Sequence, residues 1–294
     1  MDNYYANLIY LYSQFPITDD NEDERYDFKE IIDFIGKEIT DINHDILKTD
    51  NIQIDNPVFI TGCGCSGTSL CIKLIGNHSS VYCIPFETNV FRCGLDKNIL
   101  FHIFKLFSYI CIKHGKKLWC EKTPLHVHNI NDIFETLPNA KVIIMTRHGM
   151  AVSSSLKYYY NGDFIAGVER WIKDNLGWMD NVYNDKCLIV KYEDMIRNSL
   201  TVFHKLCMYI NVEFEDLSNT QHNTRQIDLH ITPGNCLIST DERINLRLWQ
   251  INQNIYDKID ESMAKMDDNE KLIFDNFVYN NHTTNDILER IKNF

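Results

Sequence analysis

A glycine-rich turn at residues 62–69 constrains the fold of this 294-residue chain more than any other feature. An apolar, β-branched run (58–61) leads into the turn, and a helical pattern (70–75) follows at once. A strand, a glycine-rich turn and a helix in this order aim backbone N–H groups at an anion such as phosphate or sulfate. The turn therefore predicts an α/β fold with an anion site at the start of a helix.

Three templates fit this turn. Gly62 and Gly67 have the spacing of a P-loop, but Thr68 stands where the phosphate-binding lysine belongs. Gly62, Gly64 and Gly67 also spell G-x-G-x-x-G, and Glu87 follows about 20 residues later, as in dinucleotide-binding folds. The third template is an anion loop that needs neither the lysine nor a dinucleotide. The motifs downstream favour this third template.

Composition narrows the class of protein. The net charge of −12 disfavours a broad nucleic-acid or anionic-membrane surface. Ten cysteines occur without any C-x-x-C pair, and we interpret them as reduced thiols. The N-terminus lacks the features of a signal peptide, and the most apolar stretch, 99–112, is too short to cross a bilayer. We therefore expect a soluble, cytoplasmic protein with no nucleic-acid or membrane partner.

Strand and helix patterns alternate through the middle of the chain. Strands are predicted at 57–61, 81–84, 117–120, 141–146 and 187–191. Helices are predicted between and after them, at 67–77, 96–114, 127–136, 150–160, 163–182 and 193–210. Short apolar strands separated by helices indicate a parallel sheet of about five strands covered on both faces, a three-layer α/β fold.

We expect a single domain over residues 1–294. Residues 1–50 are predicted to be a helical extension, with helices at 3–13 and 25–47. The α/β core is assigned to 55–211 and a loop and helical C-terminal region to 212–294, irregular over 213–243 and helical over 249–293. Ligands of such sheets bind at the carboxyl ends of the strands, where the motifs of this chain fall.

A second motif follows the strand predicted at 141–146. Arg147 stands at its carboxyl end, and Ser155 follows eight residues later, in the next helix. An arginine at a strand end and a hydroxyl on a helix can together bind one phosphate. The alternative is an arginine paired with a surface carboxylate and a serine facing solvent.

The two elements together resemble the PAPS-dependent sulfotransferase superfamily, in which the first holds the 5′-phosphosulfate and the second the 3′-phosphate. Residues 119–124, Trp-Cys-Glu-Lys-Thr-Pro, are similar to a motif of Golgi-type carbohydrate sulfotransferases. Residues 192–194, Tyr-Glu-Asp, match a motif after the next strand, and Trp171 and Asn175 also fit. The resemblance is closest to the protein-tyrosine and Golgi-type enzymes, and it implies a P-loop-like fold.

This resemblance implies PAPS as co-substrate, no metal, and a set of site residues. Glu87, in a Glu-Thr pair, would be the general base, and Lys122 would neutralise the bridging oxygen as PAP leaves. The alternatives are a Glu87 carboxylate paired with Arg92 and a solvated Lys122. The predicted cofactor-binding residues are Gly64, Cys65, Ser66, Gly67, Thr68, Ser69, Arg147, Ser155 and Tyr192.

The chain departs from the family pattern at two points. Cys65 stands where the tyrosine enzymes have an arginine, and the residues after Arg147 read His-Gly-Met instead of Asp-Pro-Arg or Asp-Gly-Arg.

The predicted function is sulfuryl transfer to a peptide tyrosine or a glycan. An NAD(P)-binding Rossmann oxidoreductase and a non-catalytic PAPS- or anion-binding module stay open as alternatives. His126 and His128 suggest a metal clip, but no third ligand is evident, and we expect both on a surface helix.

Overall fold

A computed structural model describes residues 8–13, 22–39, 56–179, 181 and 185–215 of the chain. The strands are β1 (Val58–Gly62), β2 (Val81–Cys83), β3 (Leu118–Lys122), β4 (Lys141–Thr146) and β5 (Cys187–Lys191). The α-helices are α2 (Glu22–Ile39), α3 (Thr68–Gly76), α4 (Lys97–Lys113), α5 (Ile130–Thr136), α6 (Gly149–Leu156), α7 (Phe164–Met179), α8 (Tyr192–Arg197) and α9 (Ser199–Ile210). Three short 3₁₀ turns are η3 (Val90–Arg92), η4 (Pro124–His128) and η5 (Lys157–Tyr160).

The five strands form one parallel sheet in the order β2-β3-β1-β4-β5. This confirms the predicted parallel sheet and the place of each strand. The order puts β3 between β1 and β2, whereas a dinucleotide-binding fold pairs its first strand with its second. The Rossmann alternative therefore lacks its sheet.

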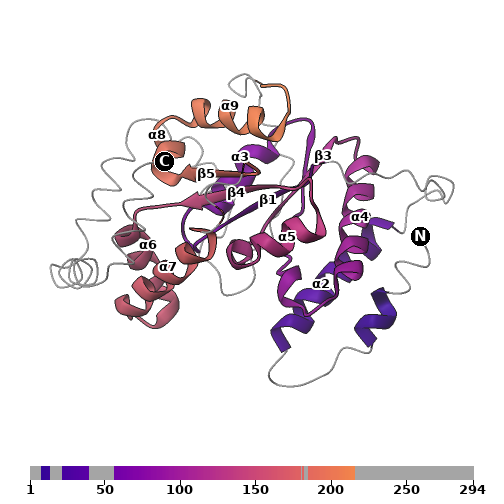
Figure 1. Ribbon diagram of the computed structural model, residues 1–294, viewed down its shortest axis with the longest axis horizontal. Coiled ribbons are helices and arrows are strands. Elements are labelled where there is room, and N and C mark those ends of the chain that lie inside the picture. Colours follow the sequence, from indigo (N-terminus) through magenta and orange to yellow (C-terminus); the bar gives the residue numbers. More distant parts are fainter. Residues whose placement is uncertain (1–7, 14–21, 40–55, 180, 182–184, 216–294) are drawn as a thin grey trace.

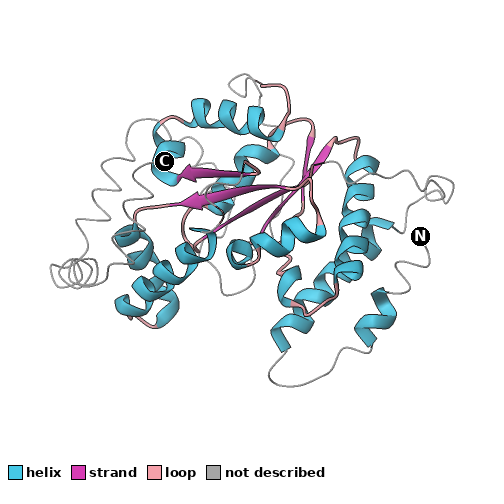
Figure 2. Cartoon of the chain, in the orientation of Figure 1, coloured by secondary structure: helices cyan, strands magenta, loops and turns pink. Residues whose placement is uncertain are grey.

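Helices cover both faces of the sheet (Figures 1 and 2). Each face has its own apolar core. On one face α3, α8 and α9 pack on Val58 and Ile60 of β1. On the other, α2, α4, α5, α6 and α7 pack around Phe59 and Trp119. Alternation along β1 explains this division, because successive side chains of a strand point to opposite faces. The three-layer prediction is confirmed.

Local signals set several helix ends. Asp96 caps α4, since its carboxylate accepts hydrogen bonds from the N–H groups of Asn98 (2.8 Å) and Ile99 (3.1 Å). The helix predicted at 127–136 is instead the 3₁₀ turn η4 followed by α5. Pro124 is the first residue of that turn and sets where it begins.

Part of the sequence prediction lies outside the described residues. This applies to most of the irregular stretch at 213–243, to the helix at 249–293 and to the remainder of the helix predicted at 25–47 beyond Ile39. Within the described ranges, no helix is long and apolar enough to cross a membrane.

Candidate active site at the carboxyl edge of the sheet

The turn after β1 has the backbone that its glycines predict. Gly62 has φ 135° and packs so closely on β4 that a Cβ there would overlap the Met145 carbonyl oxygen. Gly67 has φ 92° at the N-terminus of α3, and Cys65 also has a positive φ, 64°. Only glycine adopts such angles freely, so the glycines let β1, the turn and α3 follow one another without a break.

Hydroxyl groups of the turn lie inside the fold beside these backbone groups. Ser66 is fully buried and Thr68 nearly so. Among the described residues, the Ser66 hydroxyl is one of few buried polar groups without a hydrogen-bond partner. A buried hydroxyl beside a helix N-terminus fits an anionic oxygen, because such a ligand would satisfy the donor. The turn is thus suited to an anionic group.

Arg147 lies directly after β4 and contacts the turn. Its Nη1 donates a hydrogen bond to the carbonyl oxygen of Cys65 (2.9 Å). The guanidinium also stacks on the ring of Tyr192, with 4.4 Å between Cζ and the ring centroid. The structure therefore brings Arg147, Tyr192 and the turn together, as the motifs predict, and the alternative pairing of Arg147 with a carboxylate is not seen among its described contacts.

Neighbouring residues fix the backbone around Arg147. The indole N–H of Trp171 donates to the Arg147 carbonyl oxygen (3.3 Å), and Asn175 donates in turn to the Trp171 carbonyl oxygen (2.7 Å). The N–H of His148 donates to the Glu193 carboxylate (2.9 Å). These contacts give the Trp, Asn and Tyr-Glu-Asp matches of the sequence a structural role in holding the turn after β4.

Ser155 lies on α6, the helix after Arg147, as predicted, and its side chain is half-buried. Its hydroxyl donates to the carbonyl oxygen of Ala151 within the same helix (2.9 Å). The neighbouring Leu156 lies near Gly64, where an added Cβ would be 3.6 Å from a Leu156 methyl carbon. Ser155 is thus on the helix that borders the turn.

Glu87 and Lys122 form an ion pair at the carboxyl end of β3. The Lys122 side chain is 6% exposed and the Glu87 side chain 34%, so the pair is open on the Glu87 side. Lys122 is neither solvated nor far from the turn, since β3 pairs with β1 at Ile60↔Lys122. Among the described contacts, Glu87 pairs with Lys122 and not with Arg92, the expected alternative.

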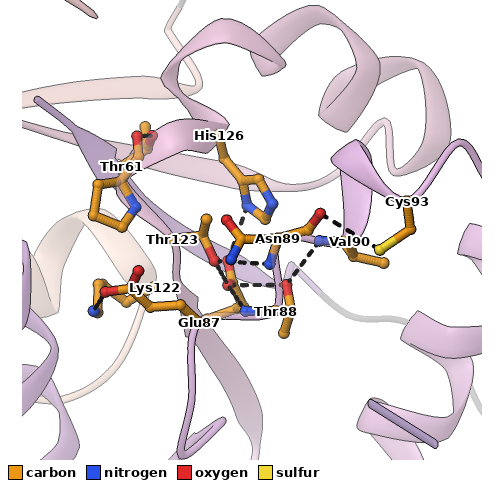
Figure 3. A network of polar contacts seen from close by, with 11 residues as sticks. Thr61, Glu87, Thr88, Asn89, Val90, Cys93, Lys122, Thr123 and His126 are labelled. Atoms are coloured by element: carbon orange, nitrogen blue, oxygen red, sulfur yellow. Dashed lines mark hydrogen bonds and ion pairs between the residues drawn. The ribbon is translucent and has the colours of Figure 1, made fainter. Parts of the chain in front are cut away.

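A buried polar network lies behind this pair and was not predicted (Figure 3). Glu121 has no exposed surface and accepts hydrogen bonds from Thr88, Thr123 and His126. The pKa of Glu121 is lowered overall: burial raises it, but the charge of His126 and the hydrogen bonds lower it more. The carboxyl group is therefore ionised inside the protein.

The prediction that His126 lies on a surface helix is wrong. His126 is fully buried in η4, where the rings of Phe59 and Phe91 pack against it with centroids 6.2 and 5.0 Å away. One sequence signal could have indicated a buried partner for His126: the Glu-Lys-Thr-Pro run before it, which brings the Glu121 carboxylate close to η4.

His128 is partly exposed and pairs with the buried Asp174 (2.9 Å), which also accepts from Arg170 Nε (2.7 Å). Burial raises the pKa of Asp174, but the hydrogen bonds from His128 and Arg170 bring it below its ordinary value. Within the described ranges, no three His, Cys, Asp or Glu side chains are grouped as a metal site.

The cysteines of the turn differ in environment. Cys63 is buried, and burial raises the pKa of its thiol well above the ordinary value, so it carries no thiolate nucleophile at neutral pH. Cys65 is half-buried in the turn. The nine cysteines of the described part of the chain are all free, in agreement with the predicted reduced thiols.

The fold and the site define a three-layer α/β protein with a glycine-rich turn and a carboxylate–lysine pair at one sheet edge. Residues 96–216 match the model of the sulfotransferase family. The chain is similar to protein-tyrosine sulfotransferase A of Caenorhabditis elegans, with 23% identity over 218 residues, 63% of this chain and 57% of the relative. It thus spans under two thirds of that relative. The resemblance drawn from the motifs is confirmed.

Solved structures similar to this chain include sulfotransferases. The sulfotransferase domain of the Synechococcus PCC 7002 olefin synthase is 23% identical, with a TM-score of 0.44, and the match covers 57% of this chain and 77% of that domain. Mouse sulfotransferase SULT7A1, complexed with PAP, is 13% identical, with a TM-score of 0.47, and the match covers 80% of this chain and 88% of that one.

Proposed function

We propose that the chain transfers the sulfuryl group of PAPS to a hydroxyl of an acceptor, a peptide tyrosine or a glycan, and releases PAP. The observation that carries the proposal is the pairing of Glu87 with Lys122 at the edge of the sheet that also holds the anion-binding turn. The similarity to a protein-tyrosine sulfotransferase supports the tyrosine acceptor.

PAPS would supply an activated sulfuryl group and a leaving phosphate. The backbone N–H groups and hydroxyls of residues 64–69 would bind its 5′ end, and Arg147, Ser155 and Tyr192 its nucleotide end. Transfer of this kind is an in-line displacement, so catalysis consists mostly of positioning and charge stabilisation.

Glu87 would remove the proton of the acceptor hydroxyl, and Lys122 would neutralise negative charge on the bridging oxygen. In the described structure the two groups bind each other, so the substrates must separate them or share the contact. The Lys122 ammonium group already lies out of water beside the Glu87 carboxylate. It can therefore neutralise the bridging oxygen without further desolvation.

Ligand binding tests the nucleotide site first. A ligand that binds only the folded state at 100 times its Kd adds about 2.7 kcal/mol of stability. We expect PAP to raise the melting temperature and AMP, which lacks the 3′-phosphate, to raise it far less. The Arg147→Ala variant should lose the PAP shift, while Arg197→Ala, which removes an exposed arginine from α8, should keep it. Equal shifts for wild type and Arg147→Ala would refute the assignment of Arg147.

Turnover tests the catalytic pair. With PAPS and a tyrosine peptide or a glycan, Glu87→Gln should keep PAP affinity and lose sulfuryl transfer. Unchanged turnover would remove Glu87 as the base. The second candidate function, a PAPS-binding module without turnover, draws on Cys65 in place of the loop arginine, and it predicts a PAP shift in the wild type with no transfer to any acceptor.

A further inference from the structure

We infer that Glu121 is a positioning residue that sets the geometry of the Glu87–Lys122 pair. The inference rests on the proposed function, because it assigns Glu121 a part in the same reaction. Glu121 precedes Lys122 on β3, and successive residues of a strand point to opposite faces. Its carboxylate therefore does not share the exposed position of the pair and acts through neighbouring residues.

The contacts of Glu121 reach both sides of the pair. Its Oε1 accepts hydrogen bonds from the backbone N–H (3.2 Å) and the hydroxyl (3.0 Å) of Thr88, the residue after Glu87. The same oxygen accepts from the hydroxyl of Thr123, the residue after Lys122. One buried oxygen thus holds the chain next to the Glu87 carboxylate and next to the Lys122 ammonium group.

A second set of contacts extends the same network. Oε2 of Glu121 accepts from Nδ1 of His126 (3.2 Å), and the N–H of Asn89 donates to the Thr123 hydroxyl (3.4 Å). The segment that carries Glu87 is therefore tied by polar contacts at two successive residues, Thr88 to Glu121 of β3 and Asn89 to Thr123, the residue after β3. Since an ionised carboxylate only accepts hydrogen bonds, it suits this set of donors better than an amide or a protonated acid.

Positioning of this kind affects the rate more than the affinity. A displacement of about 1 Å at reacting groups can reduce a rate about 100-fold while the fold persists. The network contacts the residues beside Glu87 and Lys122 and has no described contact with the anion-binding turn or Arg147. Its loss should therefore lower kcat and leave PAP binding nearly intact.

Thr88→Val is the most conservative test. It removes the hydroxyl that donates to Glu121 and accepts from the Val90 N–H (3.4 Å), but it keeps the shape and the backbone N–H of Thr88. Thr88→Ser keeps the hydroxyl. Thr136→Val is the matched control, because Thr136 is also buried but its hydroxyl has no partner among the described residues. We expect Thr88→Val to lower kcat about tenfold or more, with PAP affinity within about twofold of wild type, and Thr88→Ser to restore kcat.

A second readout needs no acceptor. Lys122 is nearly buried and paired, so its acetylation by acetic anhydride, followed by peptide mass spectrometry, should be slow in the wild type. We expect faster acetylation of Lys122 in Thr88→Val and in Glu121→Gln, and wild-type rates in Thr88→Ser and Thr136→Val.

The two readouts separate the inference from the proposed function. Absence of sulfuryl transfer by the wild type would refute the function, and acetylation of Lys122 would still decide whether Glu121 holds the pair. An unchanged acetylation rate in both Thr88→Val and Glu121→Gln would overturn the inference. If Thr88→Val lowers the PAP affinity and the melting temperature together with kcat, the inference is overturned as well, because such a result indicates a structural role alone.

Discussion

At the scale of single residues, the groups at strand ends were predictable and the groups behind them were not. Glu87 and Arg147 follow strands whose apolar patterns are clear, and Lys122 ends another, so their place at one edge follows from the parallel order of the sheet. His126 could not be placed in this way. Its burial depends on Phe59 and Phe91, which are distant in sequence and contact it only in the folded chain.

Asp27 makes a prediction at the same scale. It lies buried on α2, where Nδ2 of Asn89 donates to its Oδ1 (3.2 Å), and burial raises its pKa from 3.8 to about 6. The folded state therefore keeps a proton that the unfolded chain loses above about pH 4. The contribution of protonated Asp27 to the free energy of unfolding is complete below about pH 4 and is lost as the pH rises through about 6. This loss lowers the free energy of unfolding by about 3 kcal/mol.

Asp27→Asn cannot ionise and should escape this loss. Relative to wild type, the variant should gain up to about 3 kcal/mol of unfolding free energy between pH 4 and pH 8, measured by urea denaturation. Asp33→Asn, which changes an exposed aspartate of the same helix, should show no such trend. A stability difference between Asp27→Asn and wild type that does not vary with pH would contradict the assignment.

At the scale of elements, local patterns predicted all five strands, and tertiary contacts moved their ends. The sequence predicts that the third strand ends at residue 120, but in the structure β3 continues to Lys122. Two successive charged residues, Glu121 and Lys122, indicate in the sequence that the strand has ended. The hydrogen bonds of Glu121 and the ion pair of Lys122 allow both to be buried, and nothing in the spacing of the sequence reveals these partners.

The turn between β1 and α3 makes a prediction at this scale. In Gly67→Ala the new Cβ would lie 2.5 Å from Cδ2 of Tyr192, at a residue with φ 92°. Gly115→Ala is the matched control, because Gly115 also has a positive φ, 67°, but open space around it. Both variants should lose about 1–2 kcal/mol of stability from backbone strain, and Gly67→Ala about 1–3 kcal/mol more from overlap.

The two glycine variants should also differ in ligand binding. Displacement of Tyr192 disturbs the ring on which Arg147 stacks, so Gly67→Ala should lose the melting-temperature shift with PAP. Gly115→Ala should keep it. If both variants keep the shift, the turn does not bind the nucleotide in the way proposed.

At the scale of the whole molecule, α2 belongs to the same apolar core as the sheet. The sequence predicts residues 1–50 as a helical extension, and its apolar stripe indicates one buried face. In the structure Phe28, Ile31 and Ile35 are fully buried in the cluster that also contains Phe59 and Trp119. Helix α2 lies beside α4 in Figure 1. The apolar stripe predicts that one face of α2 is buried, but only the fold shows that this face packs on the core around Phe59 and Trp119.

Ile31→Ala tests whether α2 and the sheet unfold together. Removal of a fully buried isoleucine should cost about 2–5 kcal/mol, whereas Ile112→Ala, at a side chain 52% exposed on α4, should change stability by no more than about 0.5 kcal/mol. Three of the four tryptophans, Trp119, Trp171 and Trp178, lie in this core and dominate the fluorescence change, whereas far-UV circular dichroism reports on all helices. In Ile31→Ala both signals should shift to one lower midpoint, because a single cooperative core unfolds in one step. A loss of helical signal that precedes an unshifted tryptophan transition would show that α2 unfolds separately from the sheet.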